Sequence, residues 1–210
     1  MSWRDKLFQN ALLEGTGVPV IPSYSCRGPW KKNNDDFTRS WEKIREQNPH
    51  FHPSQWILKS NIGNGGHGVK LLTSGEELKE NMNELYRKGD QKYHLQPYLP
   101  NAVEYRLFFI GNEFIGTLKK TASPENGWHN IGQGGQAEFL PPMESPMDCL
   151  QYAELVRGEC PFDYGAIDFL ALKNSKYFLE VNLVPGFEAF EKASTINIAG
   201  KLVQLLTKYQ

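Results

Sequence analysis

Apolar and polar residues alternate in the stretch FLEVNLVPGF, at positions 178–187. In a strand such alternation puts the apolar residues on one face and Glu180 and Asn182 on the other. Asp168 lies twelve residues before Glu180, inside the apolar run YGAIDFLAL. Two carboxylates on adjacent strands are costly to bury without a compensating positive group. Oxygen ligands of this kind suit Mg²⁺, which one or two carboxylates hold while substrate phosphates complete its shell. The alternative is an ordinary hairpin in which Glu180 is solvated.

The rest of the pattern predicts an alternation of helices and strands. Expected helices lie at residues 2–14, 36–47, 74–88, 145–158 and 196–209, and expected strands at 18–24, 56–59, 69–72, 94–99, 104–110 and 113–120. Residues 121–135 are rich in glycine and polar residues and predict a long loop. Because long loops inside compact domains are often functional, we interpret this one as a candidate active-site flap.

Residues 56–72 read WILKSNIGNGGHGVKLL and predict a strand, a glycine loop and a second strand. Glycines let backbone N–H groups approach an anion, and Lys59 adds a point charge for phosphate. The spacing also fits the dinucleotide pattern G-x-G-x-x-G, but that motif needs a helix directly after the loop, and the helical pattern begins only near Ser74. The glycine loop of protein kinases has a closer geometry, yet the sequence has no H-R-D or D-F-G motif. A flexible glycine hairpin is the remaining alternative.

Five segments, in this order, resemble the ATP-grasp superfamily, and most closely its RimK-like and glutathione-synthetase-like ligases. The segments are RDKLFQNALLEGTGVPVIPSY, WILKSNIGNGGHGV, HLQPYLPNAVEYRLFFIGNEF, YGAIDFLAL and LEVNLVPGFEAFEKASTINIAG. The resemblance covers nearly the whole chain. It implies an α+β fold in which two α/β lobes with largely antiparallel sheets grip ATP. The entry helix and strand would span residues 1–24, the smaller lobe 25–97 and the larger lobe, with the metal site, 98–210.

The resemblance also implies which residues bind the nucleotide. Two lysines would contact the phosphates, four glycines would cover them, a short segment would receive adenine, and a carboxylate would bind ribose. In that order the residues are Lys6 and Lys59; Gly63, Gly65, Gly66 and Gly68; Gln96, Pro97, Tyr98 and Leu99; and Glu104. Pro97 replaces a glutamate found in several family members but keeps the backbone carbonyl, and Glu104 replaces the usual aspartate with the same acceptor chemistry.

Further residues resemble the family's catalytic and metal-binding groups. Arg106 and Lys120 match two phosphate-side cations, and Asn130 matches a residue implied to touch the transferred phosphate. A two-residue turn after Ile110 would place Lys119 opposite Glu104, whereas a three-residue loop would place Lys120 there. The sequence therefore leaves open which of the two lysines is opposite Glu104. It also leaves the alternative that these lysines belong to a solvated strand edge. The implied ligands of one or two Mg²⁺ ions are Asp168, Glu180 and Asn182.

The metal hypothesis makes a demand on the hairpin between Asp168 and Glu180. Directly opposed residues of an antiparallel pair point the same way. A loop centred on Asn174 would oppose Asp168 to Glu180, and one centred on Ser175 would oppose it to Asn182. We therefore expect an odd-numbered loop, with Asn174 in the left-handed conformation that such loops use.

Composition limits the other function classes. The 210 residues carry a formal net charge of −1, and no apolar run approaches the length of a membrane span. We expect a cytoplasmic protein that binds neither nucleic acid nor a membrane. The three cysteines follow no ligand or disulfide pattern and predict free thiols. His50 and His52 have no second ligand pair nearby in sequence, which argues against a zinc site.

The resemblance implies an ADP-forming carboxylate–amine ligase that works through an acyl phosphate. Trp128 and Val184 depart from the RimK-like pattern where the acceptor would bind, so the substrate stays unknown, with peptides and proteins among the candidates. The chain starts almost at the ATP-binding region, without the separate N-terminal domain usual in these ligases, which predicts a homodimer or a partner protein. The alternatives are a non-catalytic nucleotide-binding or regulatory module and an ATP-grasp phosphotransferase.

Overall fold

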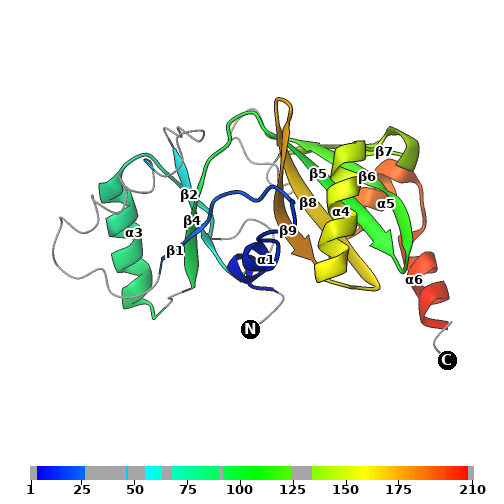
Figure 1. Cartoon of the computed structure of the whole chain (residues 1–210), viewed down its shortest axis with the longest axis horizontal. Coiled ribbons are helices and arrows are strands. Elements are labelled where there is room, and N and C mark those ends of the chain that lie inside the picture. Colours follow the sequence, from blue (N-terminus) through cyan, green and yellow to red (C-terminus); the bar gives the residue numbers. More distant parts are fainter. Residues whose placement is uncertain are drawn as a thin grey trace. The chain divides into compact units, whose positions relative to one another are not determined.

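A computed structural model of the chain describes residues 4–26, 46, 55–62, 68–89, 92–123 and 134–207. The chain forms two compact units (Figure 1). One contains Asp5–Leu7 and Ile21–Leu99, and the other contains Phe8–Val20 and Pro100–Gln210. The expected helix at 36–47, apart from Glu46, lies outside the described residues, as do most of the expected flap and Gly63, Gly65 and Gly66.

The smaller unit is built on a four-stranded antiparallel sheet with the order β1-β4-β2-β3. Its strands are β1 (Tyr24–Cys26), β2 (Trp56–Ser60), β3 (Lys70–Leu72) and β4 (Tyr93–Pro97). Helix α3 (Gly75–Arg87) begins after Ser74, whose hydroxyl accepts a hydrogen bond from the Glu77 N–H. Leu78 and Met82 of this helix pack on one face of the sheet against Trp56, Leu58 and Leu95.

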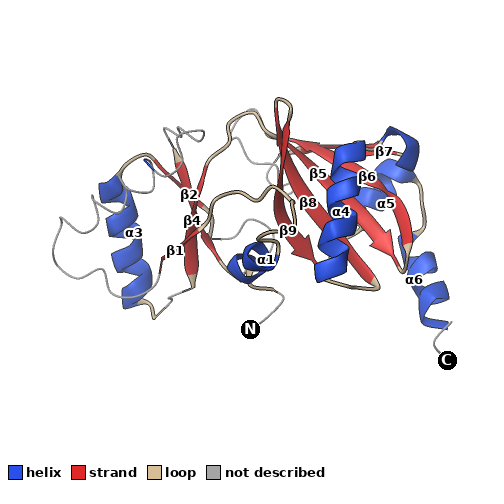
Figure 2. Ribbon diagram, in the orientation of Figure 1, coloured by secondary structure: helices blue, strands red, loops and turns tan. Residues whose placement is uncertain are grey.

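The larger unit is built on a five-stranded antiparallel sheet with the order β7-β6-β5-β8-β9 (Figure 2). The strands are β5 (Val103–Ile110), β6 (Glu113–Thr121), β7 (Gln136–Leu140), β8 (Tyr164–Leu172) and β9 (Ser175–Asn182). The helices are α1 (Lys6–Leu12), which the two units divide between them, η2 (Pro142–Glu144), α4 (Met147–Glu159), α5 (Glu188–Ser194) and α6 (Ile198–Thr207).

Each face of the larger sheet has its own apolar core. On one face Leu107, Phe109 and Ile167 pack against Ala153 and Val156 of α4. On the other face, Phe108 and Leu118 pack with Phe190 of α5 and Ile198 of α6. The second core lies at one end of the strands and therefore covers only part of that face of the sheet.

The edge strand β9 is covered by the N-terminal segment. The Gln9 side chain donates to the Val181 carbonyl at 3.0 Å and accepts from the Val181 N–H at 2.8 Å, as a neighbouring strand would. The Phe178 N–H donates to the Pro19 carbonyl at 2.7 Å. These bonds satisfy backbone groups that an open sheet edge would leave unpaired.

Several expectations on secondary structure need correction. Residues 18–24 do not form one strand: Val20 makes an isolated parallel bridge to Phe178, and β1 begins only at Tyr24. Two prolines in this segment lack the N–H that a continuous ladder needs. Strand β7 and helix α5 were not among the elements expected from the pattern. The described helices include none with the length and apolar character that crossing a bilayer requires.

The hairpin β8–β9 contradicts the expectation of an odd-numbered loop. Leu172 pairs with Ser175, so the loop has two residues, and Lys173 (φ 54°), not Asn174, has the left-handed conformation. A bulge lies between Phe169 and Asp168 on the paired strands, with Leu179 as the extra residue. The bulge shifts the register by one residue, and Asp168 opposes Glu180 despite the even loop.

The hairpin β5–β6 shows the same combination. Ile110 pairs with Glu113 across a two-residue turn, which by itself would place Lys119 opposite Glu104. A register shift between Phe108 and Phe109 then adds one residue, and Glu104 pairs with Lys120. The alternative between the two lysines is thereby decided in favour of Lys120 as the residue opposite Glu104.

Candidate functional site

Six polar residues share the part of the larger sheet that α5 and α6 leave open. We call this set the charged face. Its backbone register follows from the ladder pairs Glu104–Lys120, Arg106–Asp168 and Asp168–Glu180. The members are Glu104, Arg106, Lys120, Asp168, Glu180 and Asn182.

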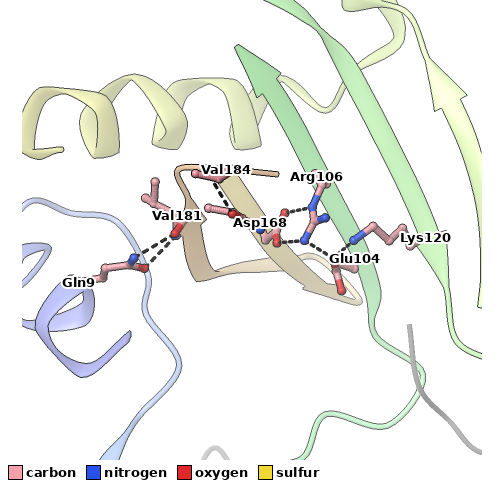
Figure 3. A network of polar contacts seen from close by, with 8 residues as sticks. Gln9, Glu104, Arg106, Lys120, Asp168, Val181 and Val184 are labelled. Atoms are coloured by element: carbon pink, nitrogen blue, oxygen red, sulfur yellow. Dashed lines mark hydrogen bonds and ion pairs between the residues drawn. The ribbon is translucent and has the colours of Figure 1, made fainter. Parts of the chain in front are cut away.

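Arg106 and Asp168 form the centre of the charged face (Figure 3). The Arg106 Nε donates to Asp168 Oδ1 at 2.7 Å, and Nη2 donates to Oδ2 at 2.6 Å. Arg106 Nη2 also lies 3.9 Å from Glu104 Oε1. Burial by itself lowers the pKa of Arg106, but the nearby carboxylates Asp168, Glu104 and Glu180 outweigh burial and raise that pKa above its ordinary value.

Lys120 pairs with Glu104 through a buried ion pair and hydrogen bond. Lys119 belongs to the opposite face of β6, where its Nζ lies 2.8 Å from Glu138 Oε2. The Glu138 side chain is 62% exposed, so this second pair is a surface one. The charged face therefore contains Lys120, and Lys119 lies apart from it.

The donor set of Asp168, Glu180 and Asn182 fits a hard divalent cation. Asp168 is fully buried, whereas Glu180 and Asn182 are half-buried. Asn182 Oδ1 accepts the Val184 N–H at 3.2 Å, which fixes the amide at the end of β9. No three His, Cys, Asp or Glu side chains gather as a metal site among the described residues. Two carboxylates with an amide form a poor cage for zinc but suit Mg²⁺ that arrives with phosphates.

The smaller unit holds the other predicted nucleotide-binding residues that the structure describes. Lys59 of β2 is opposite His94 of β4, on the face that α3 leaves open. The Lys6 backbone N–H donates to the Asn61 carbonyl at 3.0 Å. Gly68 adopts φ 73°, a conformation that favours glycine. Gly63, Gly65, Gly66 and Asn130 lie outside the described residues.

The predicted adenine segment, residues 96–99, includes the end of β4 and the two residues that follow it. Gln96 is buried, and its side-chain nitrogen donates to Ser23 Oγ at 2.6 Å. Pro97 pairs with Trp56, and the Tyr98 N–H donates to the Gln55 carbonyl at 3.1 Å. Leu99 is buried. The Gln96 side chain is thus engaged within the smaller unit.

Sequence reasoning missed a buried polar pair beside the lysines. His94 Nδ1 and Asn61 Oδ1 lie 2.8 Å apart, and both residues have no exposed surface. Burial first, and then the charges of Lys59 and Lys6, lower the pKa of His94 to about 2. Among the residues that the structure describes, His94 Nε2 and Asn61 Nδ2 have no hydrogen-bond partner. The strand period already placed His94 on the same face as Gln96, which is the signal that could have identified it.

The three cysteines are free and buried, as expected. Burial raises the pKa of Cys26 to about 12 and that of Cys160 to about 11. Thiols of this kind stay protonated at neutral pH and are poor nucleophiles. Cysteine chemistry is therefore not the chemistry of this site.

Comparison with known proteins identifies the fold and the family. The chain is 27% identical over 154 residues to a probable alpha-L-glutamate ligase 1 of Shewanella frigidimarina, and 26% identical over 205 residues to a probable alpha-L-glutamate ligase of Haemophilus influenzae. These matches cover 72% and 97% of this chain but 50% and 63% of the relatives, so the chain spans between about half and two thirds of their length.

Solved structures show the same fold at lower identity. D-cycloserine synthetase DcsG matches with a TM-score of 0.73 and 19% identity, over 99% of this chain and 70% of that one. The D-alanine–D-alanine ligase of Bacillus anthracis gives a TM-score of 0.71 and 15% identity, over 98% and 66% of the two chains. The ATP-grasp ligase PsnB, complexed with minimal precursor, Mg and ADP, gives 0.64 and 21%, over 99% and 59%.

The family model of the RimK-like ATP-grasp domain matches residues 25–206, which is most of the chain. The expected α+β fold with two antiparallel sheets is confirmed by the strand pairing and by the solved structures. The chain belongs to the RimK-like ATP-grasp domain family.

Proposed function

We propose that this protein is an ATP- and Mg²⁺-dependent, ADP-forming ligase that joins a carboxylate to an amine. The observation that carries the proposal is the charged face, on which three carboxylates, two cations and an amide lie on adjacent strands. Such a constellation suits phosphoryl transfer, in which charge on the moving phosphoryl group must be neutralised. The names of the curated relatives support the same reaction class.

In the proposed reaction, a substrate carboxylate attacks the γ-phosphorus of ATP and ADP leaves. The amine then attacks the acyl carbon and phosphate leaves. Arg106 and Lys120 would balance negative charge on the transferring group. Asp168, Glu180 and Asn182 would hold the metal ion, which supplies Lewis-acid neutralisation of the phosphates when bound. The Glu104 carboxylate would accept a hydrogen bond from a ribose hydroxyl.

The smaller unit would supply phosphate and adenine contacts. Lys59 and Lys6 offer positive charge, and because His94 stays neutral beside them, it adds no third positive charge. The glycines of the expected loop would donate backbone N–H groups to the phosphates. The backbone of Pro97, Tyr98 and Leu99 would receive adenine.

For the two substrates we propose only the chemical class, a carboxylate and an amine. Val184 follows the metal strand and is 71% exposed, so an apolar residue is accessible near the position where the acceptor is expected. An amino acid or a peptide with a free carboxylate fits the reaction class. A homodimer or a partner protein, in the cytoplasm, stays a prediction, and light scattering of the purified chain tests the homodimer.

An ADP-release screen tests the function. The purified chain is incubated with ATP, Mg²⁺ and candidate carboxylates and amines. The products are identified from their masses by mass spectrometry. Glu180→Gln should lower turnover at least about a hundredfold, since it removes a charge that the metal needs. Glu138→Gln, an exposed carboxylate on the other face of the sheet, is the matched control and should stay within about twofold.

The product distinguishes the alternatives. A new C–N bond with release of ADP and phosphate supports the ligase. ADP formation with a phosphorylated hydroxyl would indicate a phosphotransferase. ATP binding without turnover on any substrate pair would favour the non-catalytic module.

A further inference from the structure

The bidentate pair between Arg106 and Asp168 uses the same carboxylate that the proposed metal site needs. Both Asp168 oxygens accept hydrogen bonds from the guanidinium, at 2.7 and 2.6 Å. Asp168 has no exposed surface, and the Arg106 side chain is 19% exposed. Arg106 is therefore the immediate counter-ion of a buried carboxylate.

The charges around this pair explain why a counter-ion is required. Glu180 is directly opposite Asp168 on β9, and Arg106 Nη2 lies 3.9 Å from Glu104 Oε1. A buried carboxylate near two others is strongly disfavoured unless cations compensate it. Among the described residues, Lys120 pairs with Glu104, and Arg106 is held against Asp168.

A guanidinium fork and a divalent ion compete for a carboxylate. The fork satisfies both oxygens in plane, where a metal ion would also approach. For the metal to bind Asp168 well, Arg106 has to give up at least part of this pair. A nucleotide supplies what makes that exchange favourable, because its phosphates offer the arginine a new anionic partner as the metal arrives.

We propose that Arg106 is an internal substitute for the metal ion: it neutralises Asp168 until nucleotide binds, so that the divalent ion enters with the nucleotide and not before it. The inference rests on the metal assignment of the proposed function. It assigns Arg106 a second role, as a positioning residue that sets the order of binding, in addition to contact with the transferring phosphate.

The test measures metal binding without nucleotide and without turnover. Mn²⁺, which is paramagnetic, is titrated into the purified chain and free ion is followed by electron paramagnetic resonance at neutral pH. The parent chain should bind Mn²⁺ weakly. Arg106→Met removes the competing cation and should bind Mn²⁺ about tenfold or more tightly. Lys119→Met removes a cation from the opposite face of the same sheet and should match the parent.

A second variant keeps the test decisive if Arg106→Met does not fold. Arg106→Lys keeps the charge but loses the planar fork, and should show a Mn²⁺ affinity between those of the parent and the methionine variant. Equal Mn²⁺ affinity in the parent and both Arg106 variants would overturn the proposal, as would tight Mn²⁺ binding by the parent. Because the readout is metal affinity, failure of the ligase screen leaves this result interpretable by itself.

Discussion

The two sheets differ in how their strands keep register. In the smaller sheet β2 pairs with β4 without interruption, from Trp56 opposite Pro97 to Ser60 opposite Tyr93. In the larger sheet both hairpins combine a tight two-residue turn with a one-residue bulge. Each bulge lies between the turn and the charged residues, and so decides which side chain faces the site.

This difference determines which side chains the larger sheet presents on the charged face. Without its bulge, β6 would present Lys119 opposite Glu104, and β9 would present Leu179 opposite Asp168. A one-residue slip moves a whole set of side chains to the other face. The charged face is therefore assembled by two bulges, and the smaller sheet needs none to bring Lys59 opposite His94.

The largest effect is expected from replacing Gly116, the residue that permits the bulge in the β5–β6 hairpin. Gly116 has φ 144°, and a Cβ there would lie 2.6 Å from Phe139 Cε2 and 3.0 Å from the Leu140 carbonyl oxygen. We expect Gly116→Ala to destabilise the fold by about 3 kcal/mol, through strain and overpacking together. Urea unfolding followed by circular dichroism measures the change.

A second glycine provides the control for that experiment. Gly158 lies in α4 without a positive φ, and a Cβ added there would have no atom of the described part of the chain within 4 Å, apart from its own helix backbone and chain neighbours. Alanine there should leave stability unchanged or raise it by up to about 1 kcal/mol. If both variants unfold at the same urea concentration, the bulge does not depend on glycine and the comparison fails.

The β5–β6 bulge also separates two adjacent lysines whose functions should differ. Because of the bulge, Lys120 is buried against Glu104, whereas Lys119 is on the opposite face with Glu138. We expect Lys120→Met to lower kcat/KM for ATP about a hundredfold, or about 2.7 kcal/mol, and Lys119→Met to change it less than about twofold. Steady-state kinetics with the identified substrate gives the two values of kcat/KM.

The result has a clear contrary outcome. Equal losses in both lysine variants would mean that the face occupied by each side chain does not matter for nucleotide chemistry. Thermal unfolding of both variants separates a catalytic loss from a stability loss, since Lys120→Met also leaves a buried carboxylate without its ion pair.

The order of the motifs predicted Asp168, Glu180 and Arg106 as candidate site residues and left the choice between Lys119 and Lys120 open. The strand period correctly put Glu180 and Asn182 on one face, but the register of the two hairpins did not follow from the sequence. The bulge at Leu179 could not be foreseen, because an ordinary leucine marks it and its cause is tertiary packing. Gly116 offered a weak signal for the other bulge, since glycine inside a strand often marks one.

The regular register of the smaller sheet leads to the last and smallest expected effect, on the pH dependence of stability. Burial and the neighbouring lysines lower the pKa of His94 in the folded state to about 2, from an ordinary value of 6.5. Below pH 6.5 the unfolded chain therefore takes up a proton at this position that the folded chain does not. Stability is full above pH 6.5 and falls as the pH drops toward 2, by about 1.4 kcal/mol per pH unit.

His94→Gln should keep the hydrogen bond to Asn61 and remove this slope. Urea unfolding of both chains at about pH 7 and about pH 5.5 should then show a difference of about 1.3 kcal/mol in how much each loses. The other four histidines are common to both chains and cancel. Equal losses would show that His94 is protonated in the folded state at about pH 5.5, and that burial beside Lys59 does not keep it neutral.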